Sequence, residues 1–270
     1  MKDDQALLWY LHLKSGSDQE KSPGAYLLGT MHSAHASALI HMPRFTHYIL
    51  QSKHYYAESN LDSPIFKNGL NLSLQPNKNL DALMGSKLFA KATTHLERHY
   101  DLFLNRFSHL PPMMISALIG EKLMGATSGP ALDIQLWNIA KSHDLILDGI
   151  ESAHEQHAIY RRIPMEYQIG QLKGLLKNIS KSTSMLSRLA DAYHDQDLIK
   201  LYKLSKASLG PIRDILLYER NEVMANRIFY LLKNNQELSF VAIGAAHLPG
   251  VKGVLRKLKQ LGVSLQAIRF

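Results

Sequence analysis

The amino-acid sequence predicts an α/β protein with a mixed β-sheet, flanking helices and a large helical insertion. Short apolar segments typical of strands alternate with helical patterns at both ends of the chain. The middle, residues 80–207, is mainly helical and contains one buried-type strand pattern. Strands separated by helices indicate a sheet that is covered by helices. We therefore expect residues 1–270 to form a single domain, with 80–207 as a helical insertion within it.

The amino-terminal part is expected to contain a hairpin, a helix and a third strand. Residues 6–14 alternate between apolar and polar side chains, and 25–28 form a second apolar run after a polar loop at 15–24. This pattern is typical of a β-hairpin with a long loop. Apolar residues recur at helical spacing in 38–52, and the aromatic segment 54–58 follows as a strand.

The middle and the carboxyl-terminal part are assigned from the same periodicities and from their prolines. Pro111 and Pro112 end one helix and Pro211 begins another, because proline is tolerated only in the first turn of a helix. The helical middle is expected to be either a lid over the sheet edge or a contact in a homodimer, although composition does not fix the oligomeric state. The expected helices are 80–107, 113–124, 131–143, several within 151–207, 211–234 and 251–261, the strands are 145–150, 238–243 and 263–268, and the loops are 60–79 and 125–130.

Composition excludes several classes of protein. The chain has 46% hydrophobic and 20% charged residues, which is the globular range, and it has no cysteine. Disulfide scaffolds, thiolate metal sites and cysteine nucleophiles are therefore excluded. Residues 161–270 hold 18 Lys and Arg against 8 Asp and Glu, but these cations recur at helical spacing, which favours a solvated helix face. Since no nucleic-acid-binding motif accompanies them, we expect no nucleic-acid partner.

The apolar runs are all too short to span a bilayer, which takes about 18 residues, so no integral membrane segment is expected. The amino terminus leads into a strand-like segment and lacks the features of a signal peptide. We expect a soluble protein, which is either cytoplasmic or, if the sequence is the mature part of an exported protein, periplasmic.

Four predicted strands end in, or close to, a side chain that can bind a metal or move a proton. In open α/β sheets, ligands bind beyond the carboxyl ends of the strands. Two imidazoles and two carboxylates are thus expected to meet at one edge of the sheet. The four residues are His32, Glu58, Glu151 and His247.

Each of these histidines follows a glycine by three residues, in Gly29-Thr-Met-His32 and Gly244-Ala-Ala-His247. A glycine at the end of a strand lets the backbone turn sharply and leaves space for a ligand. The alternative is that both histidines are simply exposed where a strand meets a loop, since the chain contains 14 histidines.

An arginine falls inside the apolar stripe of the predicted helix 211–234. An unpaired guanidinium that faces the core costs several kcal/mol. Arg220 therefore needs an anionic partner, such as Glu58, Glu151 or a group on a substrate. A structural salt bridge, or a stem along the core with its head in water, is the alternative. The stripe itself consists of Ile212, Leu216, Val223, Met224, Arg227 and Leu231.

Motifs spread over most of the chain resemble those of one family. They are Leu8-Trp9-Tyr10, Leu28-Gly-Thr-Met-His32, Ala57-Glu58-Ser59, Leu132-Asp133, Gly149-Ile-Glu151-Ser152 with Gln156, Glu219-Arg220-Asn221 and Ile243-Gly-Ala-Ala-His247. Each motif alone is weakly specific, but together they resemble the TraB/GumN family, which includes the Tiki proteins that cleave Wnt ligands.

The resemblance implies a fold shared with the erythromycin esterases and the haem-binding ChaN proteins. For Tiki-like members it implies a peptidase that depends on a divalent metal. The sequence departs from common family forms at Ser152, where Thr is frequent, and at Ser59, which replaces an acidic stretch. These departures lie beside the matched residues and bear on the substrate. The matched positions are His32 and His247 for the paired histidines, Glu58 and Glu151 for the acidic residues, and Arg220 with Asn221 for the helix motif.

The preferred hypothesis is metal-assisted hydrolysis of a peptide or small acyl substrate, with Mn, Co or Zn as the divalent metal. His32, Glu58 and His247 are assigned to the metal and Glu151 to general base catalysis, although the two carboxylates can exchange roles. Arg220, next to Asn221, stabilises an oxyanion or orients a carboxylate. The alternative is a non-catalytic regulatory protein that binds a peptide or haem in the same cleft. A serine hydrolase is more distant, because the chain has no G-x-S-x-G elbow.

Overall fold

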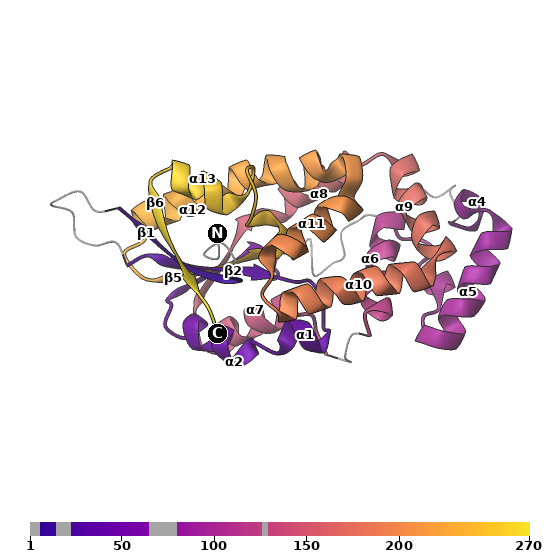
Figure 1. Ribbon diagram of the computed structural model, residues 1–270, viewed down its shortest axis with the longest axis horizontal. Helices are drawn as coiled ribbons and strands as arrows, with labels where there is room; N and C mark the ends of the chain where they lie inside the picture. Colours follow the sequence, from indigo (N-terminus) through magenta and orange to yellow (C-terminus); the bar gives the residue numbers. More distant parts are fainter. Residues whose placement is uncertain (1–5, 15–22, 65–79, 126–128) are drawn as a thin grey trace.

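The computed structural model describes residues 6–14, 23–64, 80–125 and 129–270. Residues 15–22, 65–79 and 126–128 of the predicted loops lie outside the described residues, as does the start of the chain. The described residues form a mixed sheet with helices on both faces and a helical layer to one side (Figure 1). This architecture confirms the predicted α/β class.

Within the described residues, the sheet has six strands in the order β4-β3-β5-β2-β1-β6. β1 (Leu8–Leu13) is antiparallel to both of its neighbours, β2 (Ala25–Thr30) and β6 (Val263–Ile268). β2 is parallel to β5 (Ser239–Gly244), β5 to β3 (His54–Ser59), and β3 to β4 (Ile146–Glu151). The predicted hairpin and the predicted strands are thus all confirmed. The carboxyl ends of four adjacent parallel strands also lie at the same edge.

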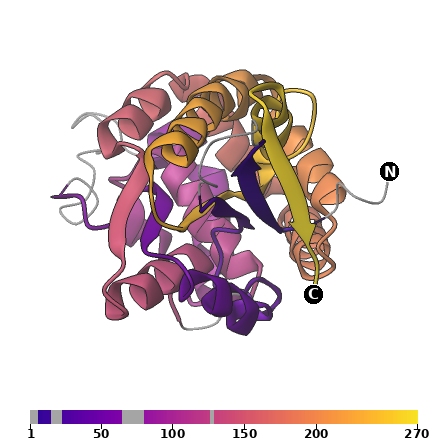
Figure 2. The same ribbon diagram turned by 90° about the vertical axis from the view of Figure 1, so that its left-hand side faces the viewer.

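Helices cover both faces of the sheet. α12 (Glu219–Asn234) and α13 (Val254–Gln260) lie above the strands in Figure 1, and α2 (Met42–Ile49) and α7 (Leu132–Ser142) lie below them. Figure 2 shows β4 at one edge of the sheet and β6 at the other.

The core between sheet and helices contains stacked aromatic side chains. Tyr55 of β3 stacks on Phe240 of β5 with ring centroids 5.7 Å apart, and the edge of Trp137 from α7 packs against Tyr55. Burying a large apolar side chain contributes about 1.5–3 kcal/mol. Since Tyr55 and Phe240 are each the second residue of their strand, this packing fixes α7 on the sheet near the amino ends of β3 and β5.

A second buried cluster holds the helical layer together. Leu96, Ile119 and Leu172 are fully buried in it, and it is separate from the core of the sheet. The layer forms the right-hand part of Figure 1. Whether it acts as a lid stays a prediction. Its elements are α4 (Leu80–Met84), α5 (Ser86–Tyr100), η1 (Leu104–Phe107), α6 (Pro112–Leu123) and α9 (Met165–Lys177).

Three further helices join this layer to the sheet: α8 (Ala153–Arg161), α10 (Ile179–His194) and α11 (Leu198–Leu209). The carboxyl-terminal part of α10 enters the core of the sheet, where the hydroxyl of Tyr193 donates to the backbone oxygen of Gly29 at 3.0 Å. This bond ties α10 to the end of β2.

Two predicted helices are interrupted at residues with special backbone preferences. Residues 38–52 form α1 (Ala36–Leu39) and then α2, because Pro43 must lie in the first turn of a helix. Residues 80–107 are divided at Gly85, whose φ is 88°, and the long helix ends at Asp101, whose φ is 49°. The sequence pattern alone did not reveal these breaks.

The predicted helix 211–234 contains a change of helical type. It begins as η2 (Gly210–Ile212) and the π-helical turn η3 (Asp214–Tyr218) before α12. A π turn closes i→i+5 hydrogen bonds and so contains one residue more than an α-helical turn. An apolar stripe counted at α-helical spacing from Ile212 is therefore out of phase after this turn. Val223, predicted in the stripe, is 40% exposed, whereas the buried face of α12 consists of Arg220, Asn221, Met224, Ala225, Ile228 and Leu232.

Candidate active site

The structure brings the four predicted strand-end residues to one edge of the sheet. Glu58 and Glu151 lie in the last two residues of β3 and β4. His32 follows β2 by two residues, and His247 ends η4 (Ala245–His247), directly after β5. The four strands concerned, β4, β3, β5 and β2, are the adjacent parallel strands of the sheet. The meeting point thus follows from the strand order.

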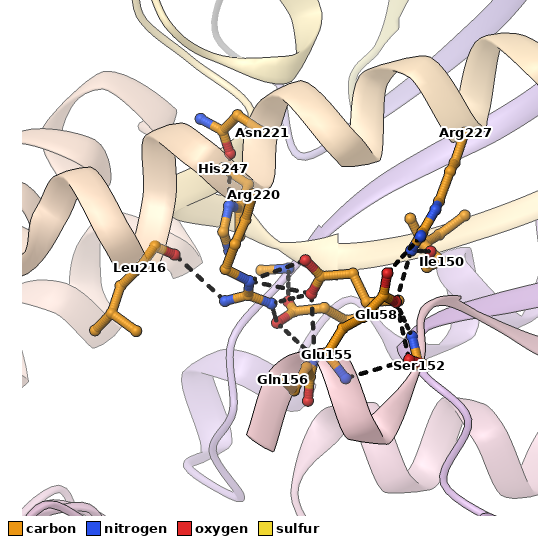
Figure 3. Close-up of polar contacts among 12 residues, drawn as sticks. Glu58, Ile150, Ser152, Glu155, Gln156, Leu216, Arg220, Asn221, Arg227 and His247 are labelled. Carbon is orange, nitrogen blue, oxygen red and sulfur yellow. Dashed lines mark hydrogen bonds and ion pairs between the residues drawn. The ribbon is translucent and has the colours of Figure 1, made fainter. Parts of the chain in front are cut away.

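Arg220 holds both carboxylates. Its Nη2 atom donates to Oε1 of Glu58 and to Oε2 of Glu151, the latter at 2.5 Å, and its Nε atom lies 3.0 Å from Oε2 of Glu151 (Figure 3). Nη1 donates to the backbone oxygen of Leu216 in the π turn at 3.3 Å. The inward-facing Arg220 predicted from the sequence is therefore present, and its anionic partners are the two glutamates.

This cluster is almost closed to water. The exposed fractions of the side chains are 8% for Arg220, 14% for Glu58 and 2% for Glu151. Burial raises the pKa of Glu58, but Arg220 and the nearby histidines outweigh burial and hold that pKa well below its usual range. Burial likewise opposes the charge of Arg220, and the two carboxylates hold its pKa above the usual value. Glu58 and Arg220 are therefore both charged at neutral pH.

His247 is buried and neutral. Burial lowers its pKa to about 4, although Glu58 acts in the opposite direction. Its Nδ1 atom lies 2.6 Å from Oδ1 of Asn221, while Nδ2 of Asn221 donates to the backbone oxygen of Lys252 at 2.8 Å. Since the Asn221 amide must present its oxygen to the ring, Nδ1 carries the proton. The unprotonated atom of His247 is thus Nε2.

His32 is tied through the same ring atom, but to a carboxylate. Its Nδ1 atom lies 2.5 Å from Oδ2 of Asp133, and its Nε2 atom lies 4.0 Å from Oε2 of Glu58. The charge of Asp133 raises the pKa of His32 above its usual value. Nε2 is therefore the atom that His32 presents to the site.

The two motif glycines leave space for side chains and are not needed for their backbone angles. Neither Gly29 nor Gly244 has a positive φ. A Cβ atom on Gly244 would lie 3.3 Å from both Oε2 of Glu58 and Cδ2 of His247, and one on Gly29 would lie 2.8 Å from Leu248. The backbone amide of Gly244 also donates to Oε2 of Glu58 at 2.9 Å. Both glycines therefore allow close packing of the protein's own side chains. The predicted sharp turn does not depend on them, and the predicted space for a ligand stays a prediction.

The side chains at this edge of the sheet are of the types that bind a divalent cation, but they lie too far apart to hold one as they stand. In the described part of the chain, no three His, Asp or Glu side chains are arranged so that they could hold a metal ion. Two ligands of a tetrahedral cation with bonds of about 2.1 Å lie roughly 3.4 Å apart, and His32 and Glu58 are wider than this. Yet two imidazoles fixed through Nδ1 and a carboxylate are the donor types that Mn, Co and Zn bind.

Three nearby residues had no role in the sequence-based hypothesis. Asp133 contacts His32 as described above, and Gln156 donates to both glutamates at 3.4 Å. Tyr160 is 37% exposed, and burial together with Glu58 raises its pKa. Gln156 and Tyr160 are four residues apart on α8, so they share one face. Because Gln156 and Tyr160 follow Glu151 closely and are spaced for one helix face, the sequence could have indicated that both lie near the site.

The fold and the site together define an α/β protein whose parallel strands present two histidines and two glutamates, with a buried arginine, at their carboxyl ends. The TraB/PrgY/gumN family model matches residues 13–267, and the chain belongs to this family. This confirms the resemblance inferred from the motifs.

A relative supports the Tiki-like relation within that family. The chain is 22% identical, over 305 residues, to the metalloprotease TIKI2 of Xenopus tropicalis. The alignment covers 91% of this chain and 58% of the relative, so the chain spans little more than half of that protein. No solved structure gives a significant match. Among the described residues, no helix is long and apolar enough to cross a membrane.

Proposed function

We propose that this protein is a divalent-metal-dependent hydrolase that cleaves a peptide or a related acyl bond. The observation that carries the proposal is the convergence of His32, Glu58 and His247, in which both imidazoles are held through Nδ1 and present Nε2. The similarity to a relative named as a metalloprotease supports the same class of reaction.

In this proposal His32 and His247 bind the cation through Nε2 and Glu58 supplies an oxygen ligand. A divalent cation, when bound, supplies Lewis acidity and lowers the pKa of water towards about 7. Mn, Co and Zn all accept this ligand set, so the metal is not assigned further. Binding requires the 4.0 Å gap between His32 and Glu58 to close and the raised pKa of His32 to be overcome.

Arg220 has a positioning role in this proposal. It is bonded to both carboxylates and so fixes the direction in which Glu58 points. Glu151 is the more buried carboxylate, and both of its oxygens contact Arg220. General base catalysis by Glu151 stays a prediction, and it requires a change in that contact. Loss of a general base lowers turnover by about 10²–10⁴-fold, which Glu151→Gln would reveal.

The test adds Mn²⁺, Co²⁺ or Zn²⁺ separately to metal-free protein and measures cleavage of a peptide library by mass spectrometry. Metal-dependent cleavage is expected for the unchanged protein and for His99→Ala, an exposed histidine on α5 that serves as the control. His32→Ala and His247→Ala are expected to show none. Cleavage that survives both of these substitutions would reject the assignment.

A second candidate function is supported by a different observation. Arg220 already forms ion pairs with both glutamates, and the described residues include no group of three ligands ready for a metal. A site in this state suits a protein that binds a peptide or haem without turnover. Calorimetry with metal ions, haemin and short peptides distinguishes the two functions. Tight binding that needs no metal and gives no product would favour the second one.

A further inference from the structure

The two histidines of the site differ in how firmly the fold holds them. His247 is 4% exposed and lies in η4, enclosed by the core. The side chain of His32 is 66% exposed and lies between β2 and α1. Exposed side chains exchange rotamers within picoseconds to nanoseconds, so packing alone does not fix the ring of His32. Another group has to hold it if Nε2 is to stay directed at Glu58.

Asp133 is placed to do this. Its Oδ2 atom lies 2.5 Å from Nδ1 of His32, and its own side chain is only 15% exposed. Asp133 belongs to the first turn of α7. The start of this helix is bonded to the loop that carries His32, because the Leu132 amide donates to the backbone oxygen of Ser33 at 3.0 Å. The start of α7, which carries the carboxylate, is therefore bonded to the loop that carries His32.

The same arrangement occurs at the other histidine. Asn221 accepts from Nδ1 of His247, as Asp133 pairs with Nδ1 of His32, so each ring is tied at the same atom and presents Nε2. An oxygen partner on the second ring nitrogen orients an imidazole ligand, and its removal lowers metal affinity by about 10–100-fold.

We propose that Asp133 is a positioning residue of this site, which holds Nδ1 of His32 so that Nε2 faces Glu58 and can bind a divalent cation. The proposal rests on the proposed function, because it concerns the same cation. It adds a residue on α7, outside the four strand ends, to the machinery.

The competing explanation is purely structural. A carboxylate in the first turn of a helix stabilises that helix through its dipole, whatever lies next to it. A loss of stability in Asp133→Asn would not separate the two explanations, so the test needs readouts at His32 itself and at the cation.

The matched control is Asp144→Asn. Asp144 is exposed, lies just beyond the other end of α7, and has a φ of 57°, which asparagine tolerates. Both variants remove one carboxylate charge by the same isosteric change. Circular dichroism and thermal unfolding establish that each variant is folded before the readouts are compared.

The first readout is proton NMR of the metal-free protein. The short contact between Nδ1 and Asp133 predicts a strongly downfield, exchange-protected imidazole proton, which His32→Gln assigns by its disappearance. Asp133→Asn is expected to lose or shift this resonance, and Asp144→Asn is expected to keep it. This readout needs neither metal nor substrate.

The second readout is calorimetry with Zn²⁺ and Mn²⁺ alone. Asp133→Asn is expected to bind about 10–100-fold more weakly than the unchanged protein, and Asp144→Asn is expected to bind equally well. An unchanged resonance, or binding of equal and measurable affinity in the two variants, overturns the proposal. If the unchanged protein binds neither ion while the resonance depends on Asp133, the cation-binding function fails and the contact that orients His32 stands.

Discussion

Helix α12 carries two arginine–glutamate clusters, two turns apart, that differ in their surroundings. Arg220 pairs with Glu58, and Arg227 pairs with Glu155 (Figure 3). Arg220 is buried between Glu58 and Glu151, whereas the side chains of Arg227 and Glu155 are 40% and 44% exposed. Both contacts are short: Nη2 of Arg227 lies 2.6 Å from Oε1 of Glu155. Geometry alone does not distinguish the two clusters.

Their energetics are expected to differ because of water. Solvent screens an exposed ion pair, so its net contribution is about 0–1 kcal/mol. A buried charge that loses its partner keeps its full desolvation penalty, so breaking the pair is much more costly. The outer pair, Arg227 and Glu155, joins α12 to the start of α8. The inner cluster, Arg220 with Glu58 and Glu151, fixes the two carboxylates of the site. The following predictions test this contrast, from the largest expected effect to the smallest.

Arg220→Ala is expected to lower the free energy of unfolding by about 3–5 kcal/mol, because two buried carboxylates lose their counter-ion. Urea denaturation followed by circular dichroism measures this loss. Arg220→Lys restores the charge without the paired contacts and is expected to recover part of the stability. If Arg220→Ala costs no more than Arg227→Ala, the contrast between the clusters is wrong.

Glu151→Gln is expected to cost about 1–3 kcal/mol, since a buried charged hydrogen bond is replaced by a neutral one while Glu58 still neutralises Arg220. The free energy of unfolding is again the measurement. Asp148→Asn, which changes an exposed acid on the same strand, provides the control. Equal stability of the two variants would contradict the importance of burial.

Arg227→Gln is expected to lower the free energy of unfolding by only about 0.2–1 kcal/mol, in keeping with an exposed pair. Because salt screens exposed charges, the difference from the unchanged protein should shrink between low salt and about 1 M salt. The cost of Arg220→Ala should change far less over the same range, and a parallel decrease in both would argue against this prediction.

The outer pair also predicts a small pH dependence. The hydrogen bond from Arg227 lowers the pKa of Glu155 from 4.5 to about 2. Because the folded pKa is the lower one, this carboxylate stabilises the fold above about pH 4.5, and the effect is lost as the pH falls towards 2. Solvent exposure limits the effect to less than about 1 kcal/mol. Comparing unfolding of Arg227→Gln and the unchanged protein at about pH 6 and pH 3 measures it, and a constant difference would be the opposite result.

Much of the fold could be predicted because local patterns carry it. Alternation and apolar runs identified the strands, and Arg220 stood out as a charge in an apolar stripe. The breaks at Pro43 and Gly85 and the π turn before Arg220 were not found, because they depend on single residues and on packing that periodicity averages over. The identities of the four strand-end residues were predicted, and their roles in binding or catalysis remain predictions.

The sequence by itself determined which chemical groups stand at the ends of the strands, since a residue that follows an apolar run is carried to the edge of the sheet. Only the tertiary structure decided which of these groups touch. The strand order places Glu58 next to Glu151, the phase of α12 after its π turn directs Arg220 between them, and α7 brings Asp133 to His32. Contacts between elements far apart in the chain depend on how helices and sheet pack, and no local pattern of residues encodes that packing.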